Sequence, residues 1–415
     1  MEILQILIKS WFGLFTQNRF PKPDFESGYV YPEHVYSVPN EVLWVHADLV
    51  VLVLLMSFVA WAVIRKQVRW PVMLTSVVSV AYFGFFRKGC VCSVGAIQNV
   101  ALSLTNDAYA IPLYALLLFI LPIVFTLFFG RVFCAGVCPL GALQELVNIK
   151  NYKLSNTITR VLKIFPWIYL GFAVLFAVTN SQFIICRFDP FVGIFRLGGE
   201  WPMIGFGVLL LVFSVFTGRP FCRFICPYGA ILSLFSRVSF RKVKITQKDC
   251  INCQLCHNAC PVDAIRPPYE NKVDESRSVG VKRILLYLVL FPIMFAVGVT
   301  IMDKLSDQFS KVNNDVRLYD MVMENEAQPQ AVQSLELQAF YAQGKTVEEL
   351  EAQVTVIKND FRLYSRLIGA FIGLFFTLAL INLSTKRTRK QYEIDDANCV
   401  SCGRCFSYCP QNTEK

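Results

Sequence analysis

Long apolar runs alternate along this chain with short basic connections. Seven runs reach or approach the length needed to cross a hydrocarbon core of about 30 Å as a helix rising about 1.5 Å per residue. They are Val42–Ile64, Pro71–Phe86, Ile111–Gly130, Ile164–Val178, Trp201–Phe216, Ile284–Met302 and Leu367–Leu383, and the second and fourth are short. The pattern predicts an all-α polytopic membrane protein with about 6–7 transmembrane helices.

Basic residues gather in every second connection, which sets the expected orientation. The connections after the first, third, fifth and seventh runs contain Arg65, Lys66, Arg69; Lys150, Lys153, Arg160, Lys163; Arg237, Arg241, Lys242, Lys244; and Lys386, Arg387, Arg389, Lys390. The positive-inside rule makes these connections cytoplasmic. We therefore expect a multi-pass protein of a bacterial inner (cytoplasmic) membrane. Arg87 and Lys88 conflict with this orientation, because it places them outside.

The apolar runs and the cysteine motifs together divide the chain into segments. The expected segments are 1–41, an N-terminal interfacial or outer segment; 42–240, a membrane core; 241–281, the first half of a ferredoxin domain; 282–383, a transmembrane hairpin with an outer helical insert at 303–362; and 384–415, the second ferredoxin half. The insert has eleven acidic and six basic residues, which suits the outer side. Asn314–Tyr319 recurs within it as Asn359–Tyr364, which indicates two facing helices.

The composition agrees with a membrane protein and excludes two other classes. Hydrophobic residues make up 55% of the 415 residues, charged residues make up 17%, and the mean hydropathy is +0.47. This balance excludes a soluble enzyme. The net charge of +10 suits a nucleic-acid-binding protein, but most basic side chains lie beside the apolar runs, as at the cytoplasmic ends of membrane helices. We expect membrane lipid, and no nucleic acid, among the partners.

Two cysteine runs repeat the spacing of bacterial ferredoxins, Cys-x2-Cys-x2-Cys-x3-Cys-Pro. In that pattern, three thiolates hold one 4Fe–4S cubane and the fourth Cys binds the neighbouring cluster. The spacing predicts a first cluster on Cys250, Cys253, Cys256 and Cys409, and a second on Cys399, Cys402, Cys405 and Cys260. Two complete copies argue against a zinc site or a purely structural role.

The two runs must share one side of the membrane to form a single small α+β domain of the bacterial ferredoxin type. The hairpin between them satisfies this condition, because one span leaves the cytoplasm and one returns. Cys253–His257 also matches a c-type haem attachment motif, but its cysteines belong to the longer run. The sequence ends soon after Pro410, whereas Val262, Ala264 and Ile265 follow the first run. We therefore expect the second cluster to be the more exposed.

A further motif, Phe-x-Gly-Arg-x-Phe-Cys-x3-Cys-Pro-x-Gly-Ala, occurs twice, at Phe128–Ala142 and Phe216–Ala230. Its cysteines, Cys134, Cys138, Cys222 and Cys226, are called the inner set, and the two copies can present four thiolates at one pseudo-symmetric site. The other shared positions have expected roles: a turn at Gly130 and Gly218, contact with an anionic cluster or a lipid headgroup at Arg131 and Arg219, and a helix start at Pro139 and Pro227. A redox or quinol-handling site and buried free thiols both remain open.

A degenerate third copy lies at Cys90–Gln98, where Cys92 aligns with Cys138. The expected orientation places it on the outer side, where Cys186 is the other cysteine. Cys90, Cys92 and Cys186, called the outer set, can form a metal site, or two of them can form a disulfide in an oxidising compartment. The sequence does not decide between these two alternatives.

These residues together resemble NosR-like membrane polyferredoxins, with relatives among NapH-type quinol dehydrogenases. The resemblance rests on Arg87–Cys92 with Gly95–Gln98, on the two Cys-x3-Cys-Pro copies and on the ferredoxin run, and it covers about residues 42–260 and 367–410. It implies electron transfer between a cytoplasmic or quinol donor and a periplasmic acceptor, often through a flavin domain before the first span. About 40 residues precede that span here, so a separate flavoprotein subunit is expected to replace this domain.

The expected function is that of a membrane electron-transfer subunit. Its 4Fe–4S clusters pass electrons between a cytoplasmic or quinol donor and a periplasmic acceptor or flavoprotein. It has no catalytic residue of its own and acts as a component of an oxidoreductase complex, for example as a quinol dehydrogenase. A maturation or metal-reducing factor for a periplasmic metalloenzyme and a redox sensor are the alternatives. Clusters at one surface do not span a core of about 30 Å, so an additional iron–sulfur or metal site in the membrane is expected.

Overall fold

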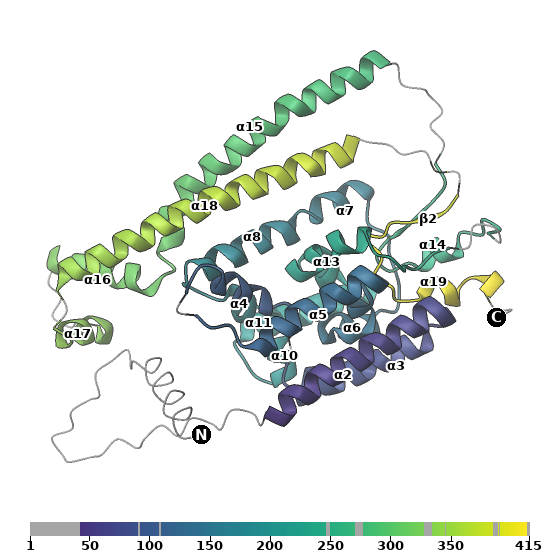
Figure 1. The fold of residues 1–415 in the computed structure, drawn as a ribbon, viewed down its shortest axis with the longest axis horizontal. Helices are drawn as coiled ribbons and strands as arrows, with labels where there is room; N and C mark the ends of the chain where they lie inside the picture. Colours follow the sequence, from purple (N-terminus) through teal and green to yellow (C-terminus); the bar gives the residue numbers. More distant parts are fainter. Residues whose placement is uncertain are drawn as a thin grey trace. The chain divides into compact units, whose positions relative to one another are not determined.

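The computed structural model describes residues 42–89, 92–107, 109–245, 250–269, 277–327, 334–344, 346–384, 389 and 391–412. The chain divides into two compact units, whose elements are labelled in Figure 1. Asn40–Leu305 with Leu363–Lys415 forms the larger unit, and Ser306–Arg362 belongs to the smaller. The N-terminal segment 1–41 lies outside the described residues.

The apolar runs are helical. They form α2 (Val42–Ala60) continued by the π-helix η1 (Trp61–Lys66), α3 (Trp70–Ser79) continued by the π-helix η2 (Val80–Phe86), α5 (Leu113–Phe129), α8 (Phe165–Val178), α11 (Trp201–Phe216), α15 (Arg277–Ser310) and α18 (Val347–Ser384). Among the described residues, four helices are long and apolar enough to cross a membrane, and Trp70–Phe86, Leu113–Phe129 and Trp201–Phe216 are shorter apolar helices. The protein is a mostly helical membrane protein, and the count of seven spans remains a prediction.

Short helices connect the long ones and form the interior of the core. They are α4 (Ala96–Ser103), the π-helix η3 (Phe133–Val137), α6 (Pro139–Leu146), α7 (Asn156–Leu162), α9 (Ile184–Arg187), α10 (Val192–Arg196), α12 (Pro220–Phe224) and α13 (Pro227–Arg237). Pro139 and Pro227 occupy the first positions of α6 and α13, as predicted, because proline has the backbone angle of a helix and lacks an N–H that the first turn would leave unpaired. α4 packs on α8, α6 on α3, and α13 on α5 and α8.

The two cysteine runs form one small domain. Its elements are α14 (Leu255–Ala259), β1 (Ile265–Arg266), β2 (Glu393–Ile394), α19 (Arg404–Ser407) and the 3-10 turn η5 (Pro410–Asn412). β1 and β2 pair antiparallel with Ile265 opposite Ile394, and Arg266 donates to Asp395 at 2.5 Å. The pairing joins segments that are distant in the sequence.

The second ferredoxin half packs onto the membrane core. Gly130, which has a positive φ of 76°, leaves room for Ser401, because a Cβ on this glycine would lie 3.3 Å from Ser401 Oγ. Gly403 lies against Arg69, because a Cβ on this glycine would be 3.6 Å from the Arg69 Cα. Ser401 and Arg404 are buried, whereas Ile251 in the first cysteine run is 59% exposed. The expectation that the second cluster is the more exposed is therefore wrong, because the core covers it.

The hairpin helices α15 and α18 approach each other closely through glycines. Gly298 of α15 lies against the backbone of Gly369 of α18, with no space for a side chain on either. α18 packs in turn on α8, where Trp167 stacks on Phe375 with ring centroids 4.0 Å apart. None of the apolar window of α15 is buried inside the protein. This exposed surface suits contact with lipid.

The smaller unit is helical, as the insert was expected to be. It contains α16 (Asn314–Ala327), α17 (Leu335–Ala342) and the first part of α18, and its core consists of Val316, Val322, Leu337, Phe340, Leu350 and Val354. The Glu349 N–H donates to Thr346 Oγ1 at 3.3 Å, so the predicted helix cap is present. Lys358 Nζ lies 5.8 Å from the ring centre of Tyr319. The two copies of the Asn-Asp repeat therefore lie on helices that face each other.

Arg87, which conflicts with the predicted orientation, is neutralised by a buried carboxylate. Arg87 Nη2 lies 2.7 Å from Asp48 Oδ2, and Asp48 is fully buried in α2. The Tyr82 hydroxyl donates to the other oxygen of Asp48 at 3.0 Å. The pair compensates the buried charge of Asp48, and the conflict of Arg87 and Lys88 with the predicted orientation remains.

Candidate functional site

The cysteines assigned by spacing to the second ferredoxin cluster line one cavity. Cys260 comes from the first half of the domain, and Cys399, Cys402 and Cys405 come from the second. The Ala264 N–H donates to Cys260 Sγ at 3.2 Å, a bond of the kind that tunes cluster potentials. Four soft sulfur donors around one largely apolar cavity fit an iron–sulfur cluster.

The cysteines assigned to the first cluster gather at the exposed end of the domain. Cys250, Cys253 and Cys409 all lie within electrostatic range of Cys256, and Cys253 is exposed to solvent. His257 Nδ1 lies 2.6 Å from the carbonyl oxygen of Ile265, so its ring is held against β1. The hydrogen bond fixes the orientation of the His257 ring within the small domain.

The distances between ligand side chains differ between a site for a single metal ion and a site for an iron–sulfur cluster. Within the described ranges, no three His, Cys, Asp or Glu side chains converge closely enough to hold a single metal ion. A cubane holds its ligand sulfurs further apart than one ion does, because each sulfur binds a different iron atom. Soft thiolate donors of this kind suit iron–sulfur clusters.

The four cysteines of the inner set meet inside the membrane core. Cys134, Cys138 and Cys226 are buried, and all three other thiols lie within electrostatic range of Cys138. The Gln144 Nε2 donates to Cys222 Sγ at 3.5 Å. The structure thus brings together the four thiols that the sequence repeat pairs.

The arginine of each repeat copy crosses into the other copy. A Cβ on Gly141 would lie 3.6 Å from Arg219 Nη1, and a Cβ on the equivalent Gly229 would lie 3.2 Å from Arg131 Nη2. These glycines therefore leave space for the guanidinium groups. The reciprocal contacts show that the two copies are related by approximate twofold symmetry around the thiols.

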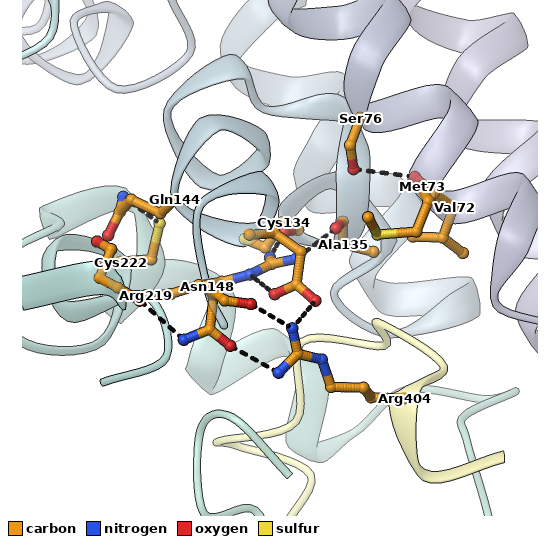
Figure 2. A network of polar contacts seen from close by, with 12 residues as sticks. Val72, Met73, Ser76, Cys134, Ala135, Gln144, Asn148, Arg219, Cys222 and Arg404 are labelled. Atoms are coloured by element: carbon orange, nitrogen blue, oxygen red, sulfur yellow. Dashed lines mark hydrogen bonds and ion pairs between the residues drawn. The ribbon is translucent and has the colours of Figure 1, made fainter. Parts of the chain in front are cut away.

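Both arginines are buried next to the inner set. Arg219 is 0% exposed and donates to the carbonyl oxygens of Cys134 and Ala135 (Figure 2). Arg131 lies 3.8 Å from Cys134 Sγ and donates to the Ala397 carbonyl of the second ferredoxin half at 3.1 Å. Contact with lipid headgroups, one of the two predicted roles, is therefore wrong. The guanidinium groups place positive charge beside the thiols.

Glu145 forms the centre of an ion-pair network that sequence reasoning missed. Its carboxylate lies 3.1 Å from Arg219, 3.2 Å from Arg404 and 3.2 Å from Arg69, and it is 2% exposed. Burial alone raises the pKa of Glu145, but the three guanidinium groups outweigh it and hold the pKa below its usual value. The one available signal was its isolation, since it is the only acidic residue between Asp107 and Asp189.

This network links the ferredoxin domain to the inner set. Arg404 belongs to α19 and also donates to Asn148 Oδ1 at 2.6 Å, as Figure 2 shows. Arg219 lies within electrostatic range of both Cys402 and Cys222. One buried cation therefore lies between a thiol of the second ferredoxin site and a thiol of the inner set.

The two thiols of the outer set that the structure describes also meet. A Cβ on Gly95 would lie 3.0 Å from Cys186 Sγ and 4.0 Å from Cys92 Sγ. Both are free thiols in the structure, and Cys90 lies outside the described residues. Cys92 and Cys138 line one cavity. The outer and inner sets are therefore neighbours.

Helix α3 and its π-helical continuation contact all three sites in order. Arg69, at the start of α3, lies against Gly403 between Cys402 and Cys405. Ser79 donates to the Val137 carbonyl next to Cys138 at 2.5 Å. Further along, Gly84 packs on Phe195, which lines the cavity shared by the inner and outer sets. The first two contacts, ten residues apart on α3, are separated by about 15 Å at about 1.5 Å per residue.

Known sequences with the same motifs support the cysteine assignment. A family described as 4Fe-4S binding domain matches residues 111–155 and 200–246, which contain the two inner copies. A second family with the same description matches residues 243–266, which contain the first ferredoxin run. Both matches concern iron–sulfur binding, and no solved structure matches the chain.

Among similar proteins, the regulatory protein NosR of Stutzerimonas stutzeri is 32% identical over 210 residues, which span 46% of this chain but only 29% of NosR. The ferredoxin-type protein NapH of Haemophilus influenzae is 30% identical over 35% of this chain and 53% of NapH. An uncharacterized protein of Methanocaldococcus jannaschii is 31% identical over 44% of this chain and 77% of its own length. With its iron–sulfur motifs and apolar helices, the chain belongs to the NosR/NapH-like family of 4Fe–4S ferredoxin-type membrane electron-transfer proteins.

Proposed function

We propose that this protein carries single electrons across the membrane core, between a donor at the ferredoxin domain and an acceptor on the opposite side. The observation that supports this is the order of three thiol sites along α3, from Gly403 through Val137 to Phe195. Iron–sulfur clusters supply reversible one-electron transfer when bound. The chain holds their ligands at successive depths, so that no single step spans the full core of about 30 Å.

The buried arginines have a defined part in this proposal. Thiolate-bound clusters carry negative charge, which is costly in a medium of low dielectric constant. Arg131 and Arg219 offset that charge at the inner set, and Arg219 does so for Cys402 as well. Glu145 in turn fixes Arg219 and Arg404. The network thereby orients the cations that face two thiol sites.

The proposed partners follow from the position of each site. The exposed Cys253 end of the ferredoxin domain suits contact with a cytoplasmic electron donor, and a membrane quinol is the alternative donor. On the opposite side, the acceptor is a periplasmic redox protein, for example a separate flavoprotein subunit. The proposed location is the bacterial inner membrane, with the ferredoxin domain in the cytoplasm.

Iron and acid-labile sulfide analysis of anaerobically purified protein tests the cofactors. We expect about eight iron atoms for the two ferredoxin clusters, with about four more if the inner set holds a third cluster. Replacing Cys253 and Cys402 together with serine should lower the iron content, because each removes a ligand from a different ferredoxin site. Zinc in place of iron, or an unchanged iron content in the double variant, would contradict the assignment.

Labelling with a membrane-impermeant thiol reagent tests the orientation. A cysteine introduced at Glu326 of the smaller unit, where the side chain is exposed, should react in spheroplasts of intact inner membrane. A cysteine introduced at exposed Gln254 should react only after the membrane is opened. The reverse pattern would overturn the orientation and would make the haem interpretation of Cys253–His257 tenable again.

A further inference from the structure

Asp189 is a buried carboxylate next to the outer set. It is 5% exposed and lines the same cavity as Cys92 and Cys138. It lies within electrostatic range of both Cys92 and Cys186. Phe191 donates its N–H to Asp189 Oδ1 at 2.9 Å, and Arg196 lies within electrostatic range of the carboxyl group. A carboxyl group buried beside two thiols requires an explanation, because burying a polar group is costly.

The sequence around Asp189 is a fourth, degenerate copy of the inner repeat. Cys186–Pro190 reads Cys-Arg-Phe-Asp-Pro, and Cys222–Pro227 reads Cys-Arg-Phe-Ile-Cys-Pro. With one residue omitted, Cys186 aligns with Cys222, and Asp189 takes the position of Cys226 before the proline. A carboxylate therefore replaces the second thiol of this copy.

Equivalent hydrogen bonds join the copies in pairs. The copy around Cys186 lies against the copy around Cys92 in the same way as the copy around Cys222 lies against the copy around Cys138. Gln144 accepts the N–H of Phe221, the residue before Cys222, at 3.0 Å. Gln98, six residues after Cys92 as Gln144 is six after Cys138, accepts the N–H of Ile185, the residue before Cys186, at 2.9 Å. The same side-chain-to-backbone bond thus fixes both pairs of copies.

The close contacts of the sulfur atoms repeat the same arrangement. A Cβ on Gly141 would lie 3.4 Å from Cys222 Sγ, and a Cβ on Gly95 would lie 3.0 Å from Cys186 Sγ. Gly229 donates its N–H to Cys226 Sγ at 3.3 Å, and Gly95 donates its N–H to Cys92 Sγ at 3.4 Å. The outer thiols therefore repeat the positions of Cys138 and Cys222, and Asp189 supplies the position that Cys226 holds in the inner set.

We propose that Asp189 is a ligand of an iron–sulfur cluster bound by Cys92 and Cys186, a second membrane site built on the plan of the inner set. This inference rests on the proposed function, in which the outer set binds a redox cofactor. Iron accepts carboxylate oxygen as well as thiolate sulfur, so the exchange of Cys for Asp preserves binding. The oxygen ligand donates less electron density than a thiolate and so stabilises the reduced cluster relative to an all-cysteine site.

Iron analysis and EPR spectroscopy of the full chain test this ligand. Asp189→Asn keeps the side-chain oxygen that accepts the Phe191 N–H but removes the anionic ligand, so it separates ligation from a merely structural turn. We expect Asp189→Asn to lose about four iron atoms per chain and one EPR signal of the dithionite-reduced protein. Asp189→Cys should restore both, with a lower midpoint potential for that signal. Asp107→Asn, at an exposed aspartate, is the control and should leave the spectrum unchanged.

The outcomes separate this inference from the proposed function. If Cys92→Ser loses the iron and the signal while Asp189→Asn keeps both, the outer cofactor exists but Asp189 is not its ligand. If neither variant loses iron, the outer set holds no cluster, and both the inference and the outer part of the relay are wrong. If Asp189→Asn removes iron but Asp189→Cys does not restore it, the carboxylate acts through the fold, and its assignment as a ligand fails.

Discussion

Replacing Cys138 and Cys226 together with serine should reduce electron delivery from the ferredoxin domain to an outer acceptor to the background of protein-free vesicles. The two positions belong to different repeat copies, so the double variant removes one thiol from each side of the inner set. Without that set, the proposed relay lacks the site that lies between the ferredoxin domain and the outer set along α3. Anaerobic proteoliposomes that enclose an acceptor dye provide the measurement, and the ferredoxin clusters should remain assembled and reducible.

Ser76→Ala is the matched control for this double variant. Ser76 packs against the inner loop, since a Cβ on Gly136 would lie 2.9 Å from its Oγ, but its hydroxyl bonds only to Val72 within α3. The control should transfer electrons at the parent rate. An unchanged rate in the cysteine variant would mean that the inner thiols are structural and that electrons cross by another route.

Glu145→Ala should destabilise the protein by about 3–5 kcal/mol, the cost of removing one partner from a buried ion pair. The expected effect is large because one carboxylate pairs with three guanidinium groups, of which Arg219 is fully buried. Thermal unfolding in detergent measures the loss. Iron retention should fall with it, since Arg404 no longer holds the second ferredoxin half against the core.

The control for Glu145 is a pair on the same domain surface. Asp396→Ala breaks the ion pair with Lys242, in which both side chains are partly exposed, at 25% and 30%. Water and salt screen such a pair, so its loss should cost about 1 kcal/mol or less. Equal effects of the two substitutions would show that the Glu145 network contributes no more than a surface pair.

The sequence predicted those features whose signal is local. Apolar runs predicted the helices, because a membrane requires a long, uninterrupted apolar segment. Cysteine spacing grouped Cys260 with Cys399, Cys402 and Cys405, and the structure brings these four around one cavity. The repeat likewise paired the inner thiols, because two copies of one motif fold in the same way.

Features that depend on packing between distant segments were missed. The burial of the second ferredoxin site arises from contacts of Ser401 and Gly403 with the core. No pattern in the local sequence predicts a contact between segments so far apart. The role of Glu145 could not be predicted from its position in a helix, because its three arginine partners come from three different segments of the chain. Asp189 escaped notice because its motif lacks both one residue and one cysteine.

The pairing of β1 with β2 also dictates when the protein can be completed during biogenesis. Ile265 leaves the ribosome long before Ile394, its partner strand residue, and the intervening helices must enter the membrane first. Until then, the cavity next to Cys260 is incomplete, because the other three cysteines that line it have not been synthesised. In the proposed topology, iron delivery to this site therefore follows membrane insertion. We expect a chain whose hairpin does not return to the cytoplasmic side to lack this cluster.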